Sequence, residues 1–282
     1  MNLLDEITNR ARKSQAHVGV GVGATGANAG VAADAHNKSV IADIQRASEF
    51  AEIRLIGKAE QIHTINTDLE TVSSETPELE LVRQLADGRI DAAVRGTLSA
   101  TKTLSHLKDV FKVPALQRLA LLTTADDTPF FLAPVGIDEG NSTDDKIKLI
   151  CKSTAYITEK FGIHLRVAVL SGGRFEDAGR SALIDQSLAD GEFTADKLRE
   201  HGINAKHHGI LIEDAIKNAN FIVAPDGITG NLIFRTLTFL GDGNGFGAPV
   251  LMKPVFVDTS RVKTNLSNAI MLASALAWTD ER

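Results

Sequence analysis

The sequence predicts an α/β protein with mostly parallel sheets, and two observations lead to this prediction. Short β-branched runs alternate with longer amphipathic stretches along the chain, as in βαβ units built around a parallel sheet. The 282 residues are 43% hydrophobic and 23% charged, which is typical of a globular protein with a core large enough for one large or two ordinary domains.

The short apolar runs are expected as strands, at residues 17–22, 52–56, 92–94, 119–123, 130–135, 166–170, 221–223 and 254–257. The amphipathic stretches are expected as helices, at residues 33–50, 78–87, 143–161, 181–188, 194–201, 212–217, 232–240 and 266–278. In the stretch 143–161, apolar residues recur at helical spacing and predict a buried stripe of Ile147, Ile150, Cys151, Ala155 and Ile157.

A change in composition at residues 124–129 predicts the junction where a first domain gives way to a second. The glycine-rich segment 241–247 is too flexible for the interior of a helix or strand. We expect this segment to form a mobile loop that precedes the return of the chain to the first domain.

The composition argues against several classes of function. A net charge of −6 and an aromatic content of 5% give little material for a nucleic-acid surface. Residues 1–13 lack the apolar core of a signal peptide, and no stretch of about 18 apolar residues occurs. With the single cysteine Cys151, which fits a reducing compartment, these features predict a cytoplasmic protein that contacts neither membrane nor nucleic acid.

Two short patterns have a plain structural explanation beside a functional one. Residues 21–26 match G-x-G-x-x-G, which keeps a nucleotide enzyme or a methyltransferase open, but no acidic residue follows the strand at 52–56 to bind a ribose. A structural glycine-rich turn is the commoner explanation. His207 and His208 have no further ligands at metal-binding spacing, so we expect a surface pair and no bound metal.

The segment 225–231 lies between an apolar run and an apolar helix, and Asp226, Thr229, Gly230 and Asn231 are its candidate binding residues. Thr229 or Asn231 is expected to cap the helix, and the free N–H groups of a helix start favour a phosphate or carboxylate. An ordinary Asp-Gly turn explains the same spacing equally well.

The segment 258–261 repeats this arrangement between a strand and a helix. Ser260 offers a hydroxyl beside the guanidinium of Arg261, a pair suited to phosphate, although a solvated arginine is the simpler explanation. Arg95 follows one predicted strand and Arg118 opens another. Each of these two arginines either faces a pocket or lies on the surface.

Taken in order, these segments resemble the phosphate acetyl/butyryltransferase family from about residue 15 to the end of the chain. Residues 162–171 are similar to the central strand of the family and end in Ser171, and residues 190–193 resemble its Asp-Gly segment. Residues 225–231 are similar to its most recognisable motif, and residues 253–261 to the run that enters its C-terminal helix.

The resemblance implies a two-domain isocitrate/isopropylmalate-dehydrogenase-like fold with mostly parallel sheets and an interdomain cleft. Residues 1–128 and 254–282 are then the first domain, which contains both termini, and residues 129–253 the inserted second domain. The family forms homodimers and moves an acyl group between coenzyme A and phosphate, with no bound cofactor or metal. The expected ligands are a coenzyme A thioester and phosphate or acyl phosphate.

By the same resemblance Ser260 and Arg261 are the expected catalytic residues, at the phosphate or acyl phosphate. Further phosphate- and substrate-binding residues are expected to be Arg118, Arg95, Asp226, Thr229, Gly230, Asn231 and Ser171. The coenzyme A thiol needs a base, because the thiolate is the nucleophile. The acetyltransferases have an aspartate a few residues beyond the Ser-Arg pair, whereas residues 262–268 of this chain contain no carboxylate.

A closer resemblance is to the MtxX proteins of methanogens, also called methanogenesis marker protein 4, on the run 257–263. It implies an alternative function: a methanogenesis-associated, methyltransferase-related protein that binds a phosphorylated metabolite without transferring acyl groups. The sequence supplies no corrinoid ligand and no convincing S-adenosylmethionine motif.

Overall fold

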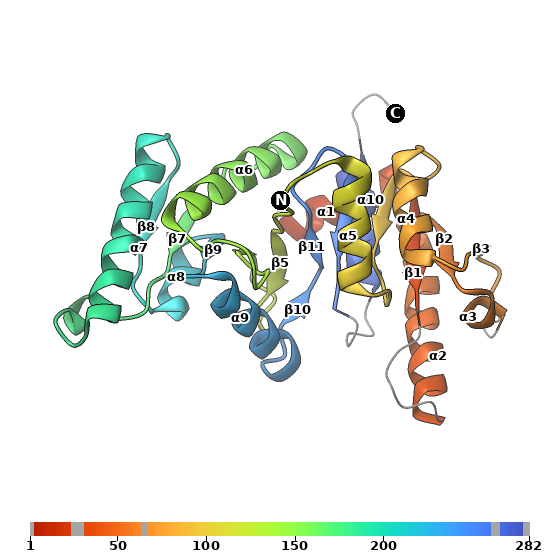
Figure 1. The fold of residues 1–282 in the computed structure, drawn as a ribbon, viewed down its shortest axis with the longest axis horizontal. Coiled ribbons are helices and arrows are strands. Elements are labelled where there is room, and N and C mark those ends of the chain that lie inside the picture. The colour runs from red at the N-terminus through yellow and green to blue at the C-terminus, as the bar shows by residue number, and fades with distance from the viewer. Residues whose placement is uncertain (1–2, 24–30, 64–66, 261–265, 279–282) are drawn as a thin grey trace. The chain divides into compact units, whose positions relative to one another are not determined.

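Helices and strands alternate along the chain, which confirms the predicted α/β class (Figure 1). The structure is a computed structural model that describes residues 3–23, 31–63, 67–260 and 266–278, without the side chains of 31–38. The chain forms two compact units, residues 1–116 with 246–282 and residues 117–245. The expected boundaries at 128/129 and 253/254 differ from these. The first would cut the antiparallel hairpin of residues 120–123 and 129–133, and the second would separate residues 248–249 from 257–258, with which they pair.

Unit 1 (residues 1–116 and 246–282) is built on a sheet that, in the described residues, has the order β11-β12-β4-β1-β2-β3. All neighbouring strands are parallel except β11 and β12. The strands are β1 (Ala16–Val22), β2 (Ala51–Gly57), β3 (Glu70–Ser73), β4 (Ala92–Val94), β11 (Ala248–Pro249) and β12 (Val255–Asp258). The helices are α1 (Leu3–Ser14), α2 (Val31–Arg46), the short η1 (Ala47–Glu49), α3 (Ala59–His63), α4 (Pro77–Ala86), α5 (Ala100–Phe111) and α10 (Ser267–Ala277).

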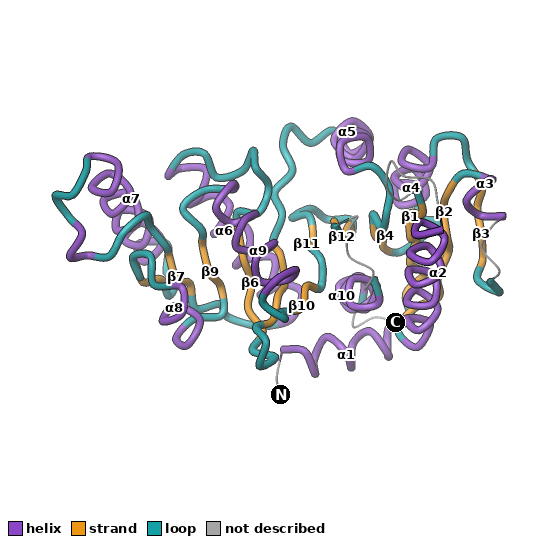
Figure 2. The backbone as a smooth tube through the Cα atoms, turned by 90° about the horizontal axis from the view of Figure 1, so that it is seen from below, coloured by secondary structure: helices purple, strands orange, loops and turns teal. Residues whose placement is uncertain are grey.

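Helices cover both faces of this sheet, as its buried strands require. Figure 2 shows α4 and α5 on one face, and α10 with α1 on the other. Under α4 and α5, the fully buried Leu81, Leu107 and Phe256 belong to one apolar cluster. The sheet is thereby fixed from both sides, and its strand ends hold the residues that follow them in defined positions.

Unit 2 (residues 117–245) has a second sheet of order β10-β5-β6-β9-β7-β8 among the described residues. Its strands are β5 (Ala120–Thr123), β6 (Pro129–Ala133), β7 (Val167–Val169), β8 (Ala205–His207), β9 (Phe221–Val223) and β10 (Asn244–Gly245). Strand β5 runs antiparallel to β10 and β6, and the other pairs are parallel. The helices are α6 (Thr143–Phe161), the short η2 (Phe175–Asp177), α7 (Ala182–Glu200), α8 (Ile212–Asn218) and α9 (Gly227–Leu240).

Three expectations about unit 2 are wrong. The helices expected at 181–188 and 194–201 are one continuous helix, α7, because Gly191 lies inside it rather than at a break. Helix α9 begins at Gly227, earlier than expected, because Asp226 and not Thr229 or Asn231 caps it. Within the segment 241–247, Asn244–Gly245 forms a short strand paired with β5 and is not a mobile loop.

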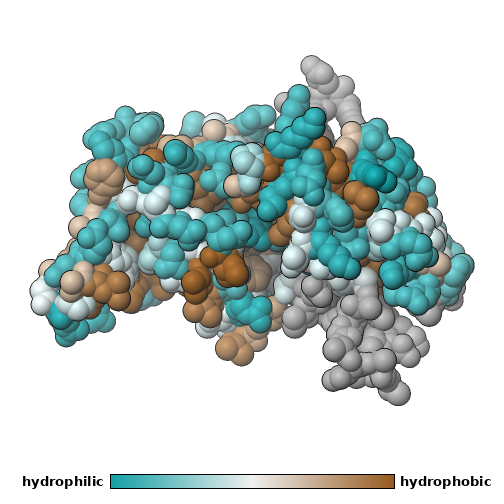
Figure 3. All heavy atoms as spheres, viewed as in Figure 1, coloured by the Kyte–Doolittle hydropathy of each residue, from teal (hydrophilic) through white to brown (hydrophobic). Residues whose placement is uncertain are grey.

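Helix α9 is unusual because apolar side chains on it remain exposed. Its fully buried residues are Gly227 and Gly230, whereas Ile228, Leu232 and Leu240 are among the exposed large hydrophobic residues. Figure 3 shows hydrophobic surface over this helix. We infer that close backbone contact at the two glycines, more than side-chain burial, holds α9 on unit 2.

The helices of the described residues include none with the length and apolar character of a membrane span.

Candidate functional site

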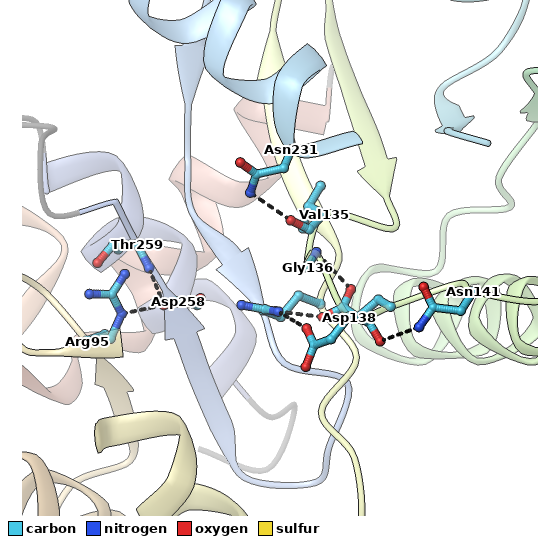
Figure 4. Close-up of polar contacts among 10 residues, drawn as sticks. Arg95, Val135, Gly136, Asp138, Asn141, Asn231, Asp258 and Thr259 are labelled. Carbon is cyan, nitrogen blue, oxygen red and sulfur yellow. Dashed lines mark hydrogen bonds and ion pairs between the residues drawn. The ribbon is translucent and has the colours of Figure 1, made fainter. Parts of the chain in front are cut away.

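In unit 1 the predicted site residues lie at the carboxyl ends of neighbouring parallel strands, where ligands bind in open α/β sheets. Arg95 directly follows β4 and Asp258 ends β12, which is paired with β4. The Arg95 Nε donates a hydrogen bond of 2.5 Å to the Asp258 Oδ1, and the two side chains are only 4% and 11% exposed (Figure 4). Arg95 Nη1 also donates to the Leu98 carbonyl at 2.7 Å. Arg95 therefore lies in a buried ion pair, and its predicted contact with phosphate stays a prediction.

This ion pair fixes the turn that carries Ser260. The same oxygen, Asp258 Oδ1, accepts a hydrogen bond from the Thr259 N–H at 2.9 Å. The Thr259 hydroxyl donates to the Gly96 carbonyl at 2.8 Å, which ties the turn to the residue after Arg95. Ser260 follows directly, and Arg261 lies outside the described residues. The arrangement can hold Ser260 in a fixed position just beyond the carboxyl end of β12.

The glycines of the G-x-G-x-x-G pattern have packing reasons in the described part of the chain. A Cβ atom on Gly21 would lie 2.6 Å from the Arg95 carbonyl oxygen. The Gly23 N–H donates to the Thr97 hydroxyl at 2.9 Å, and that hydroxyl donates to the Gly23 carbonyl at 3.1 Å. Residues 24–26 lie outside the described residues. The first two glycines thus fit the structural explanation, a close approach of β1 to the loop after β4.

In unit 2, Arg118 precedes β5 and is held by a carboxylate that the sequence did not indicate. Its Nε donates to the Glu139 Oε1 at 2.6 Å, and the Glu139 side chain is 4% exposed. The other oxygen of Glu139 accepts the Gly136 N–H at 3.2 Å, and Asp138 Oδ1 lies 3.4 Å from Arg118 Nη2. A Cβ atom on Gly136 would collide with Arg118 Nη2. The guanidinium is therefore packed across the Gly136 turn, where its position is well defined.

The start of α9 already holds an anion, the side chain of Asp226. Its Oδ1 accepts the Thr229 N–H at 2.8 Å, and its Oδ2 accepts the Thr229 hydroxyl at 3.1 Å. Asn231 donates instead to the Val135 carbonyl at 2.9 Å (Figure 4). A Cβ atom on Gly230 would collide with the Pro134 carbonyl oxygen. These four residues therefore have structural roles in the helix start. The Asp226 carboxylate accepts the Thr229 N–H, which the sequence analysis had expected to bind a ligand.

Ser171 takes part in a buried network with two residues that the sequence analysis did not select. Its hydroxyl lies 2.8 Å from His207 Nε2, and His207 Nδ1 lies 3.2 Å from Glu192 Oε2. Burial lowers the pKa of His207, although the nearby Glu192 acts in the opposite direction. The neutral ring then donates to Glu192 and accepts the Ser171 proton. The expectation of a surface histidine pair is wrong for His207, because the middle of α7 packs against β8 and buries the His207 ring inside unit 2.

The connectivity of this network matches Ser-His-acid catalytic triads, but its accessibility does not. Ser171 is only 2% exposed, so its oxygen is closed to a substrate carbonyl. Phe175 covers the His207 ring edge-on, with the ring centroids 4.9 Å apart. We therefore assign the network a positioning role for the loop after β7. Among the described residues, no group of three or more His, Cys, Asp or Glu side chains could hold a metal ion.

The chain is similar to curated proteins of methanogens, while no protein-family model matches it. "Putative methyltransferase mtx subunit X" of Methanosarcina acetivorans is 56% identical over 225 residues, which are 79% of this chain and 80% of that protein. The same-named protein of Methanosarcina barkeri is 55% identical over 224 residues, 79% of this chain and 82% of that protein. An uncharacterized methyltransferase of Methanopyrus kandleri is 38% identical over 219 residues, 76% of this chain and 85% of that protein.

Solved structures share the fold at low sequence identity. A phosphotransacetylase from Streptococcus pyogenes has a TM-score of 0.65 at 14% identity and covers 98% of this chain and 99% of its own. A branched-chain phosphotransacylase from Enterococcus faecalis has a TM-score of 0.63 at 17% identity, with coverages of 92% and 98%. A 4-hydroxythreonine-4-phosphate dehydrogenase from Klebsiella pneumoniae has a TM-score of 0.62 at 10% identity, with coverages of 93% and 100%. These neighbours confirm the predicted fold class, and the curated relatives show that the chain belongs to the MtxX family of methanogens.

Proposed function

We propose that this chain is a phosphate acyltransferase-like protein, which binds phosphate or acyl phosphate and exchanges the acyl group with coenzyme A. The observation that carries the proposal is the turn of Asp258 and Thr259, held by the buried Arg95 at the carboxyl edge of a parallel sheet. This turn leads directly to Ser260 and Arg261, the hydroxyl and guanidinium suited to phosphate. The shared fold with proteins named phosphotransacetylase and phosphotransacylase gives independent support.

In the proposed reaction the thiolate of coenzyme A attacks the carbonyl carbon of an acyl phosphate. A carbon–sulfur bond forms, the tetrahedral intermediate collapses, and the carbon–oxygen bond to phosphate breaks. Arg261 neutralises the departing phosphate, and the Ser260 hydroxyl donates to oxygen that gains charge. In the reverse direction phosphate attacks the thioester and the thiol takes up a proton.

Formation of acyl phosphate from acetyl-, propionyl- or butyryl-coenzyme A and inorganic phosphate tests this proposal. Release of free thiol is measured together with trapping of the acyl phosphate by hydroxylamine. Arg261→Ala is expected to lower the rate by about 10²–10³-fold, as loss of one charge-stabilising donor does in other enzymes. Arg12→Ala, at an exposed ion pair of unit 1, is the control that should keep the rate. Absence of turnover with all three donors contradicts the proposal.

A second candidate function is binding of a phosphorylated metabolite without acyl transfer, in association with a methyltransferase. It is favoured by the residues 262–268, which hold no carboxylate to accept the thiol proton, and by the methyltransferase names of the relatives. A ligand that binds only the native state raises its stability by about 2.7 kcal/mol at 100 times its Kd. Thermal stabilisation by phosphorylated compounds without turnover supports this candidate, and an unchanged stabilisation in Arg261→Ala contradicts the assigned anion site.

The homodimer and the cytoplasmic location come from the resemblance and the composition, and both stay predictions. Sedimentation equilibrium of the full chain tests the homodimer. A monomer at all concentrations would contradict it.

A further inference from the structure

Unit 2 contains a small pocket of about 300 Å³, lined mostly by polar residues, beside the N-terminal turn of α6. Its wall includes the ends of β7 and β9 and one side of α7. Lys146 lines the pocket and is only 8% exposed. The side chains that the argument uses are Lys146, Ser187, Asp190 and Asp226.

Lys146 is a buried cation whose charge is not neutralised by direct contact. Its Nζ donates one hydrogen bond, 3.0 Å long, to the uncharged Pro225 carbonyl. Within the described residues it forms no ion pair at 4.0 Å or less. Burial lowers the pKa of Lys146, and the more distant Asp190 and Asp226 oppose that shift. An ammonium group has three donors and costs much free energy to bury unpaired, so an anion in the pocket would satisfy it.

The lysine is held in place by its surroundings, unlike a surface lysine. Ser142 caps α6 by accepting the Asp145 N–H at 3.1 Å, which fixes the first turn of the helix that carries Lys146. Gly140 has a φ of +66° and passes so close that a Cβ atom there would lie 3.2 Å from Lys146 Cγ. The Gly140 backbone therefore packs closely against the aliphatic part of the Lys146 side chain.

The remaining polar groups define what else a ligand must carry. Both oxygens of Asp226 are engaged by Thr229, whereas Asp190 Oδ1 accepts one hydrogen bond, from the exposed Gln186. The Ser187 hydroxyl accepts the Gly172 N–H at 2.8 Å, which leaves its own proton for an acceptor in the pocket. A ligand with an anionic group and a hydroxyl group matches this set, and a volume of about 300 Å³ limits it to a small molecule.

We propose that this pocket binds a small hydroxylated carboxylate or phosphate monoester, with its anionic group on Lys146 and its hydroxyl group on Asp190. The site belongs to unit 2 alone and does not depend on the acyl transfer proposed above. A bound anion also explains why a lysine lies on the buried face of α6, one helical turn before Ile150.

The first test compares the melting temperatures of ligand-free variants. Lys146→Met removes the charge but keeps the length of the side chain. Because the ammonium is unpaired, the melting temperature is expected to stay equal to that of the wild type or to rise. Lys148→Met, at an exposed position of the same helix, is the matched control. A clear fall specific to Lys146→Met would show that the lysine serves the fold and would overturn the proposal.

The second test measures binding of D-glycerate, glycerol 3-phosphate and inorganic phosphate to the full chain by calorimetry and thermal shift. At least one hydroxylated anion is expected to bind the wild type and Lys148→Met equally. Lys146→Met should weaken that binding at least tenfold, and Arg261→Ala should leave it unchanged. A preference for glycerate or for glycerol 3-phosphate identifies which anionic group Lys146 accepts.

The proposal is overturned when none of the three probes binds the wild type, or when Lys146→Met binds as tightly as the wild type. Binding that is lost in Arg261→Ala but kept in Lys146→Met would place the anion in unit 1. That outcome overturns this inference and supports the anion site of the proposed function, so the two proposals fail separately.

Discussion

Replacing Gly191 with alanine should destabilise the protein, although the same change inside a helix ordinarily stabilises by about 1 kcal/mol. Gly191 lies in the middle of α7 and is buried. A Cβ atom there would lie 2.5 Å from His207 Nε2 and 2.9 Å from Cδ2, where ordinary contact begins at 3.4 Å. The imidazole ring must therefore move by roughly 1 Å or accept the overlap.

Both outcomes cost more than the helix gains. Moving the ring weakens its hydrogen bonds to Ser171 and Glu192, each with a net contribution of about 1 kcal/mol. Leaving the ring in place overpacks the core, at a cost of about 1–3 kcal/mol. After subtraction of the propensity gain, Gly191→Ala is expected to lower the free energy of unfolding by about 1 kcal/mol, and by no more than about 2 kcal/mol.

Urea unfolding followed by circular dichroism measures this change. A double-mutant cycle with His207→Ala supplies the control, because alanine at 191 meets no ring in that background and should be neutral or stabilising. If Gly191→Ala is more stable than the wild type, or if its effect is the same with and without His207, the steric explanation is wrong.

Two further predictions concern the buried ionisable groups. Asp258→Asn should lower the free energy of unfolding by about 3–5 kcal/mol, because it leaves the buried Arg95 guanidinium without its carboxylate; Arg12→Ala, at an exposed ion pair, should cost less than about 1 kcal/mol in the same urea titration. Burial lowers the pKa of His207 below its unfolded value, so the stability that it contributes is complete above about pH 6.5 and is lost as the pH falls through the folded pKa. Between about pH 7.5 and about pH 5, urea titrations should show a smaller loss of unfolding free energy for His207→Gln than for the wild type.

Local signals in the sequence were sufficient where one helix carries its own start and stop. The bounds 143–161 agree with α6, which has Ser142 as its N-cap and Gly162 with a φ of +67° at its end. The sequence failed at α7, because an Asp-Gly pair is typical of a turn. The reason for a glycine at 191 is the His207 ring, which comes from a strand outside that helix.

The candidate site likewise contains residues that the sequence indicated and partners that it did not indicate. The order of the motifs led to Ser260, Asp226 and Arg118, because each follows or precedes a recognisable strand. Their partners could not be predicted. Glu139 reaches Arg118 across the β5–β6 hairpin. Lys146 lay outside the expected buried stripe, which was placed wrongly: α6 buries Lys146 and Leu149 and leaves Ala155 exposed. The spacing of Lys146 to Ile150 and Ser153 on one helix face is the signal that would have found the lysine.

The order of the strands has a consequence for synthesis on the ribosome. Unit 2 is one continuous stretch, Gln117–Gly245, so all its strands are synthesised before β12. In unit 1, β4 needs β12 as a parallel neighbour, and that strand is synthesised only after the whole of unit 2. Chains fold as they are made and exposed strand edges promote misassembly. We therefore expect unit 2 to fold before unit 1. Until β12 is made, the exposed edge of β4 is the stretch that we expect to need a chaperone most.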